Sequence, residues 1–234
     1  MQTNSVSGSI PSEIALLSAL TALSLGTNAL SGSFPSEFWT MTALASVYLP
    51  YMDITGTLPT EISALTALAG FGVWGNKMDG TIPTQVGFLS KIGYFAVPDN
   101  EFTGTVPSEF GELTSWKSSF HIRGNSFISS LPTEVGRLTG LTSHLQAQAN
   151  QITGKLPTQL GLLTAFELYM RFDDNIISGE IPTEIGKLTA LTEIFYLNNN
   201  ELCGAVPTEL TTLANSVSGW NILSGNDNLG TDCS

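Results

Sequence analysis

The chain has 234 residues, of which 42% are hydrophobic and 12% are charged, and its formal net charge is −12. With only eight Lys and Arg residues, it lacks the basic surface that nucleic acids and anionic membranes attract. No apolar run reaches the roughly 18 residues that a membrane-spanning helix needs, so we expect no membrane insertion.

Prolines recur at an almost constant spacing from one end of the chain to the other. The interval is 24 residues four times and then 25 residues four times. A period of this size is typical of a solenoid, in which each copy forms one coil. The prolines that mark the copies are Pro11, Pro35, Pro59, Pro83, Pro107, Pro132, Pro157, Pro182 and Pro207.

Each copy carries two apolar residues separated by one position, and this alternation predicts a short strand with one buried face. An asparagine follows three residues after the second apolar position in most copies, where its amide can satisfy open backbone groups. Met52 takes this place in one copy, where the row of asparagines must be interrupted or bridged differently. The row consists of Asn28, Asn76, Asn100, Asn125, Asn150, Asn175 and Asn200.

The segment that begins at each proline reads Pro-Ser/Thr-Glu in most copies, as at Pro59–Glu61. A hydroxyl there is expected to cap a short helix, and the glutamate is favourable in the first helical turn. We interpret these carboxylates as structural and exposed to solvent.

The segment Leu17–Pro35 reads L-x-x-L-x-x-L-x-L-x-x-N-x-L-x-G-x-F-P. It resembles the plant-type leucine-rich repeat of plant and algal extracellular proteins, such as receptor-like-kinase ectodomains and polygalacturonase-inhibiting proteins. The resemblance implies an α/β solenoid: a right-handed superhelix of about nine coils, with a parallel sheet on its concave face and short helices or 3-10 turns on its convex face. We expect one domain over 1–234, with a partial first repeat (1–11), repeats (12–207) and a C-terminal repeat and cap (208–234).

The two cysteines, Cys203 and Cys233, lie in the final coil and its tail. A disulfide between them would close a loop of about 30 residues and stabilise the fold by about 3–4 kcal/mol. Two reduced thiols are the alternative. The family resemblance implies a disulfide-stapled C-terminal cap. It also implies an extracellular or cell-surface protein, although the chain starts in mid-repeat and without a secretory signal peptide.

Residues between and beside the core positions are predicted to face outward on the concave sheet. Aromatic residues gather in the early coils and basic or titratable residues in the middle ones, and these types are common at binding hot spots. We therefore predict a surface that binds a protein or carbohydrate ligand, in which the cations orient an acidic or hydroxylated group. The alternative is a neutral aromatic surface with local ion pairs, such as Arg171 with Asp173 or Glu193. The predicted contacts are Tyr48, Tyr51, Trp74, Tyr94, His121, Arg123, His144 and Arg171.

A second surface offers an alternative function. Hydroxyl residues two positions apart precede several of the prolines, and on stacked strands they would form a flat lattice. Such ranks suit an ice-binding or surface-adsorbing solenoid, although Asp79, Ile128, Lys155 and Glu180 interrupt them. The residues of this alternative surface are Thr55, Thr57, Thr81, Thr103 and Thr105.

Enzymatic activity is not expected. The sequence offers no nucleophile–base–acid set, phosphate-binding loop or pair of catalytic carboxylates. His121 and His144 fall on neighbouring strands, but no further ligand at suitable spacing completes a metal site. We expect neither a metal nor another cofactor.

Overall fold

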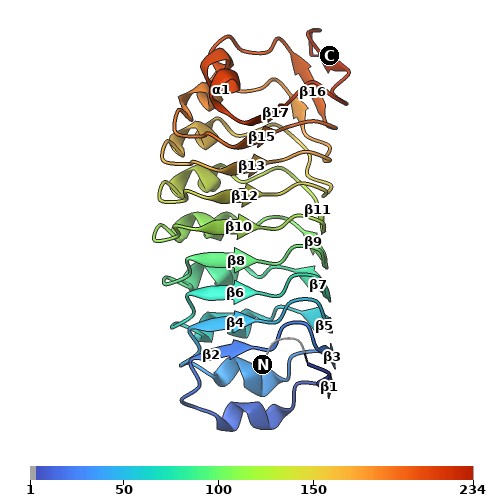
Figure 1. Cartoon of the computed structure of the whole chain (residues 1–234), viewed down its shortest axis with the longest axis vertical. Coiled ribbons are helices and arrows are strands. Elements are labelled where there is room, and N and C mark those ends of the chain that lie inside the picture. The colour runs from blue at the N-terminus through green and yellow to red at the C-terminus, as the bar shows by residue number, and fades with distance from the viewer. Residues whose placement is uncertain (1–3, 234) are drawn as a thin grey trace.

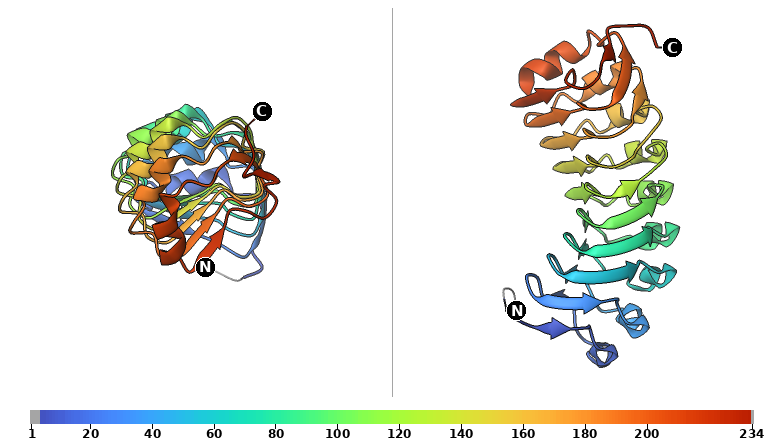
Figure 2. Two further views of the ribbon diagram at one scale, coloured as in Figure 1. Left: turned by 90° about the horizontal axis from the view of Figure 1, so that it is seen from above. Right: turned by 90° about the vertical axis from the view of Figure 1, so that its right-hand side faces the viewer.

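The computed structural model describes residues 4–233 as a stack of similar coils. Residues 1–3 and 234, at the two ends of the predicted domain, lie outside the described residues. Each coil contributes one strand to a long parallel sheet, and one lateral edge of the stack carries two shorter parallel sheets (Figure 1). The stack curves so that the long sheet lies on its concave side (Figure 2, right).

The long sheet has nine strands of three residues each, and every strand pairs with its counterpart in the next coil. Short strands are expected because each repeat supplies only two core positions. The strands are β2 (Ala22–Ser24), β4 (Ser46–Tyr48), β6 (Gly70–Gly72), β8 (Tyr94–Ala96), β10 (Ser119–His121), β12 (His144–Gln146), β13 (Tyr169–Arg171), β15 (Ile194–Tyr196) and β17 (Gly219–Asn221).

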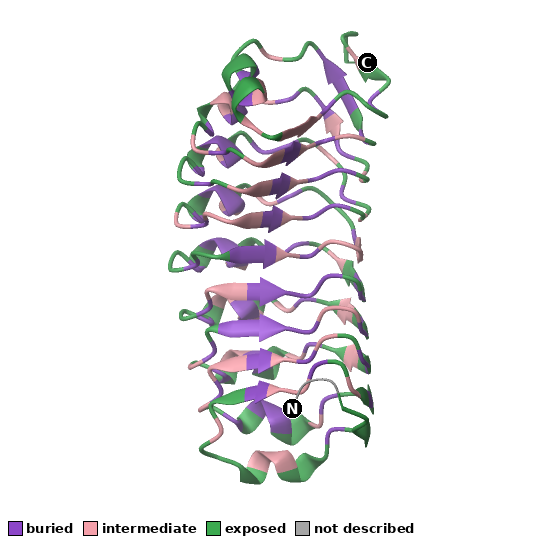
Figure 3. Cartoon of the chain, viewed as in Figure 1, coloured by how far each residue is buried: buried purple, intermediate pink, exposed green. Residues whose placement is uncertain are grey.

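The register of the long sheet follows the repeat. Phe120 pairs with Phe95 on one side and with Leu145 on the other, so that like positions stack on one another. Phe120 and Ile122 are almost fully buried, whereas His121 between them is only partly buried. The predicted alternation is confirmed, and buried strand centres line the coils in Figure 3.

The convex side carries one short 3-10 helix per coil, followed by a single α-helix near the C-terminus. The helices are η1 (Ser12–Leu16), η2 (Ser36–Thr40), η3 (Thr60–Ala64), η4 (Thr84–Phe88), η5 (Ser108–Glu112), η6 (Thr133–Arg137), η7 (Thr158–Leu162), η8 (Thr183–Lys187) and α1 (Leu210–Ser216).

The prediction that a Ser or Thr hydroxyl caps these helices is wrong. The capping position is the proline itself, as at Pro59 before η3, and no side chain caps the helix there. The hydroxyl of Thr60 instead donates to the neighbouring Glu61 carboxylate at 3.1 Å. Because proline has no N–H and a fixed φ, it fits the extended residue before the helix without help from a side chain.

The remaining strands precede the repeat prolines, except β18, which follows the last one. Six of them form one sheet, namely β1 (Ser7–Gly8), β3 (Ala29–Gly32), β5 (Asp53–Thr57), β7 (Lys77–Thr81), β9 (Glu101–Gly104) and β11 (Ser126–Phe127). Three form another, namely β14 (Ser178–Gly179), β16 (Glu201–Gly204) and β18 (Asn228–Leu229).

The asparagine row forms a ladder that joins consecutive coils. The amide of Asn76 donates to Val73 O in its own coil and to Leu49 O in the preceding coil, both at 2.8 Å. Its Oδ1 accepts a bond from Ile54 N at 3.1 Å. The same arrangement recurs at Asn100, Asn125, Asn150, Asn175 and Asn200.

The ladder is interrupted at Met52, as the sequence predicts, and it continues past the predicted row at its C-terminal end. Met52 is buried in the asparagine place and supplies a thioether instead of an amide. Near the C-terminus Asn226 joins the ladder one position later than the repeat predicts, with bonds to Leu197 O and Ile222 O.

The final coil is closed by the predicted disulfide between Cys203 and Cys233, whose Cα atoms are 5.2 Å apart. Cys203 is buried on β16, whereas Cys233 lies in the exposed tail. The bond therefore ties the tail to the last coil, as the family resemblance implied.

Replacing Asn76 with Ala should lower the free energy of unfolding by about 3 kcal/mol, because buried backbone groups lose their partners. Urea denaturation measures the change. Asn215→Ala, on the exposed side of α1, is the matched control and should stay within about 0.5 kcal/mol of the parent. Equal midpoints for the two variants would contradict the role of the ladder.

Candidate ligand-binding surface

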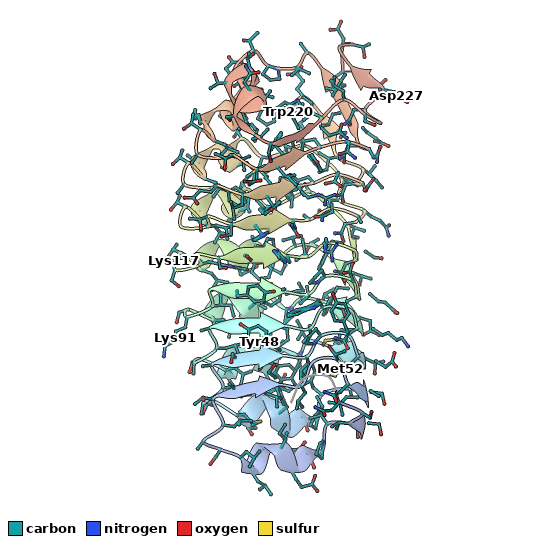
Figure 4. The ribbon with its side chains drawn as sticks, viewed as in Figure 1. Tyr48, Met52, Lys91, Lys117, Trp220 and Asp227 are labelled. Carbon is teal, nitrogen blue, oxygen red and sulfur yellow. A yellow bond between two sulfur atoms is a disulfide. The ribbon has the colours of Figure 1, made fainter. Side chains whose placement is uncertain are left out.

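Glycines on strand β6 make room for aromatic rings on the concave sheet. A Cβ atom on Gly70 would collide with the hydroxyl of Tyr48, and one on Gly72 would collide with the rings of Trp74 and Tyr48. The rings therefore lie across the glycine strand, close to the backbone. Tyr48 lies on this face of the stack in Figure 4.

Four aromatic residues form what we call the aromatic floor: Tyr48, Tyr51, Trp74 and Tyr94. The ring centres of Tyr48 and Tyr94 are 5.9 Å apart although β6 separates their strands. Tyr51 meets Trp74 edge to face at 6.5 Å. Such edge-on contacts hold the rings in fixed orientations, and Tyr51, at 60% exposure, offers the most open surface.

A row of rings continues from the floor into the middle coils. Tyr94 is 6.1 Å from His121, and His121 is 5.0 Å from His144, both edge to face. His144 in turn stacks on Tyr169 at 4.9 Å. Its Nδ1 also lies 3.0 Å from the hydroxyl of Ser119.

Both histidines are held in their neutral form at neutral pH. Burial lowers the pKa of His121 to about 4, with smaller contributions from His144 and Arg123. Burial also lowers the pKa of His144. The imidazoles thus serve as polar rings on this face rather than as cations.

The two predicted arginines are present on the concave face but are already paired. Arg123 Nη2 contacts Asp99 Oδ2 at 2.9 Å. Arg171 makes two hydrogen bonds to Asp173, at 2.9 Å and 2.6 Å. These bonds raise the pKa of Arg171. The polar patch is therefore close to neutral, although the sequence suggests a partly cationic one.

Six of the eight predicted contacts line a single open hollow of about 360 Å³, while Tyr48 and His144 lie outside its lining. Three further residues line it, of which Gln146 and Gln148 hold outward positions in the next coil after His121 and Arg123. Their place in the repeat was visible in the sequence, but neutral amides gave no signal among charged and aromatic neighbours. The lining residues are Tyr51, Trp74, Tyr94, Pro98, His121, Arg123, Gln146, Gln148 and Arg171.

The hollow contains polar atoms that the protein itself does not satisfy. Within residues 4–233, Nε2 of His121 and Oε1 of Gln148 are buried without a hydrogen-bond partner. Gln148 is only 5% exposed. A buried acceptor without a donor is costly, so Oε1 of Gln148 favours a bound donor group.

The alternative surface has a different geometry from the predicted lattice. All five threonines are exposed, but the strands pair two residues out of step with the repeat. Thr57 lies opposite Asp79 rather than Thr81, and Thr55 lies opposite Lys77. Lys77 also pairs with Asp53 at 2.7 Å. Charged residues therefore interrupt the hydroxyls between β5 and β7, although Thr81 lies opposite Thr103 on β9.

Residues 4–233 contain no group of three or more His, Cys, Asp and Glu residues placed to hold a metal ion. The same residues include no helix with the length and apolar character needed to cross a bilayer.

Solved plant receptor ectodomains have similar structures. One is the leucine-rich-repeat ectodomain of the membrane receptor kinase GASSHO1/SCHENGEN3 from Arabidopsis thaliana, solved in complex with CASPARIAN STRIP INTEGRITY FACTOR 2. It has a TM-score of 0.86 and 33% sequence identity, and the match covers 91% of this chain and 25% of that chain. Another is the Arabidopsis receptor kinase HAESA, solved in complex with the peptide hormone IDA and the co-receptor SERK1. It has a TM-score of 0.84 and 27% sequence identity, and the match covers 94% of this chain and 36% of that chain.

The chain is a plant-type leucine-rich-repeat solenoid. The plant peptide hormone receptor RGFR1, in complex with RGF2, has the same fold, with a TM-score of 0.82 and 26% identity over 96% of this chain and 39% of that chain. This leucine-rich-repeat chain thus spans only 25% to 39% of the length of the three receptor chains. No protein-family model and no curated protein sequence matches it.

A plant ice-binding protein has a TM-score of 0.59 and 20% identity over 91% of this chain and 81% of that chain. At this identity the likeness extends to the fold alone.

Replacing Gly72 with Ala should displace the rings of Trp74 and Tyr48 while the core of the solenoid remains folded. The indole N–H resonance of Trp74 in NMR spectra is the readout, and we expect it to shift. Gly93→Ala is the control, since the nearest atom to its added methyl group lies 3.8 Å away. An unchanged Trp74 resonance in Gly72→Ala would mean that the rings do not lie on the glycine strand.

Stability should fall as pH is lowered from about 6.5 to about 4. In this window the unfolded chain binds a proton at His121 that the folded chain, with a pKa of about 4, does not. The lost stability is about 2–3 kcal/mol, measurable by urea denaturation at several pH values. His121→Gln should remove most of this slope. If His121→Gln keeps the same dependence of stability on pH, groups other than His121 cause that dependence.

Proposed function

We propose that this leucine-rich-repeat chain is a non-catalytic recognition module whose concave sheet binds a segment of a protein partner. The observation that carries the proposal is the hollow in which aromatic and polar side chains from successive coils converge. Because the strands are spaced by about 4.8 Å, an occupant that crosses several coils would be an extended one. A peptide segment has this shape.

The aromatic floor supplies the apolar part of the proposed contact. Tyr51 and Trp74 are fixed edge to face, so little side-chain entropy is lost when a ligand covers them. Rigid, partly exposed aromatic rings are the residues that dominate binding energy at many interfaces. The polar hollow beside them would set the orientation of the bound segment.

The similar solved structures point in the same direction. HAESA was solved with a peptide hormone, and RGFR1 is a peptide hormone receptor solved with RGF2. This chain shares their fold over most of its own length. From these structures we carry over to this chain only one property, namely that a leucine-rich-repeat surface serves for protein recognition.

We further propose an extracellular or cell-surface location for the whole unit 1–234. The Cys203–Cys233 disulfide supports this location, because such bonds persist in oxidising compartments. The solved neighbours include the ectodomain of a membrane receptor kinase.

Carbohydrate and ice are less well supported as ligands. Aromatic rings beside polar groups also suit sugars, but the receptor complexes that resemble this chain contain peptide ligands. For ice, the charged residues between the threonines disrupt the flat hydroxyl lattice that the sequence predicts.

A phage-displayed library of random peptides tests the proposal. The immobilised protein should retain peptides, and the double variant Trp74→Ala/Arg123→Ala should bind them about 30-fold more weakly, as expected for the loss of hot-spot residues. Lys91→Ala/Lys117→Ala is the control, since these exposed lysines lie at the edge of the stack (Figure 4). Equal retention by all three proteins would place recognition elsewhere.

A further inference from the structure

We infer that the peptide segment in the concave hollow is uncharged there and presents hydrogen-bond donors rather than a carboxylate. The inference rests on the proposed function and specifies the chemistry of its ligand. It follows from two independent features of the hollow: how its cations are paired, and which of its polar atoms remain without partners.

The first feature is charge. Arg123 is held by Asp99, and Arg171 is held by two hydrogen bonds to Asp173. Asp173 is only 2% exposed, so its charge is matched almost entirely by Arg171. An acidic ligand would have to compete with these carboxylates for the same guanidinium groups. Breaking the Arg171 pair would also leave a buried aspartate without its counter-charge, which is strongly unfavourable.

The guanidinium of Arg171 is fixed on a further side as well. It lies 5.2 Å from the centre of the Tyr196 ring. Since two bonds and a ring contact define its position, Arg171 is not free to turn toward a ligand carboxylate. It forms part of a rigid wall of the hollow.

The second feature is the set of unsatisfied atoms. Oε1 of Gln148 is a carbonyl oxygen, which can only accept hydrogen bonds, and it is buried without a donor. A carboxylate placed against it would bring two acceptors together. An N–H or O–H group would instead recover a hydrogen bond that the protein does not make by itself.

His121 extends the same preference. Its Nε2 is the other unpartnered atom in the hollow, and its ring is held between Tyr94 and His144. A neutral imidazole attracts an anion much less than a cationic one would. A backbone or side-chain amide of a bound peptide offers a donor for Gln148 and can serve as either partner for Nε2 of His121.

Sequencing the peptides that the wild-type protein retains tests this inference. We expect no enrichment of Asp and Glu over the starting library, and no enrichment of Lys and Arg. Asp99→Asn releases Arg123 from its partner and should shift the retained peptides toward Asp and Glu. Asp53→Asn is the matched control, because it removes the same charge from an exposed ion pair on β5, outside the long sheet. The peptides that this variant retains should match those of the wild type.

Gln148→Leu tests the donor preference. The variant fills the same buried place but removes the acceptor, so peptides selected by the wild type should bind it about tenfold more weakly. Unchanged affinity would overturn the donor preference.

The outcomes separate the two proposals. Wild-type protein that already selects acidic or basic peptides, with binding that depends on Trp74, would overturn this inference but leave the proposed function standing. Wild-type protein that retains no peptide through Trp74 would overturn the proposed function, and this inference with it.

Discussion

The asparagine ladder is the interaction on which the rest of this solenoid depends. Each ladder amide binds backbone groups in its own coil and in the one before it, so it fixes both the turn within a coil and the spacing between coils. The apolar core also lies between neighbouring coils, which is why a single coil has no stable structure by itself. Regular stacking then places equivalent residues in columns.

Because the frame is fixed by inward-facing residues, the outward positions are free to differ from coil to coil. The concave surface uses this freedom in a specific way. Strand β6 has no side chains at Gly70 and Gly72, and the rings of Tyr48 from the preceding coil and Trp74 from the same coil occupy that space. Farther along the stack, arginine–aspartate pairs and neutral histidines replace the aromatic floor. A surface of mixed chemistry thus arises without any change in the backbone repeat.

The sequence predicted most of the frame because its signals are local and repeated nine times. The core alternation around His121 and the asparagine places follow from the spacing, whereas the disulfide follows from the terminal position of the cysteines and the family resemblance. The second sheet was harder to predict, since its strands pair two residues out of step with the repeat, as Thr57 does opposite Asp79. Asn226 was missed because its coil contains one additional residue before the ladder place.

The electrostatic state of the surface could not be predicted from the columns alone. Sequence position places Arg123 and Arg171 on the concave face, but their pairing depends on side-chain geometry. Asp99 reaches Arg123 from the coil before it, whereas Asp173 folds back onto Arg171 within one coil. Only the three-dimensional arrangement distinguishes a cationic site from a neutral one.

At Met52 the stack lacks the ladder hydrogen bonds between one coil and the next. Every ladder asparagine from Asn76 onward makes hydrogen bonds to the preceding coil. The thioether of Met52 makes no equivalent bonds to the preceding coil, which contains Asn28. The two parts of the stack that meet at this point are held mainly by strand pairing and by buried apolar surface. Partial opening costs least where such bridges are fewest, so neighbouring coils should separate most readily at Met52.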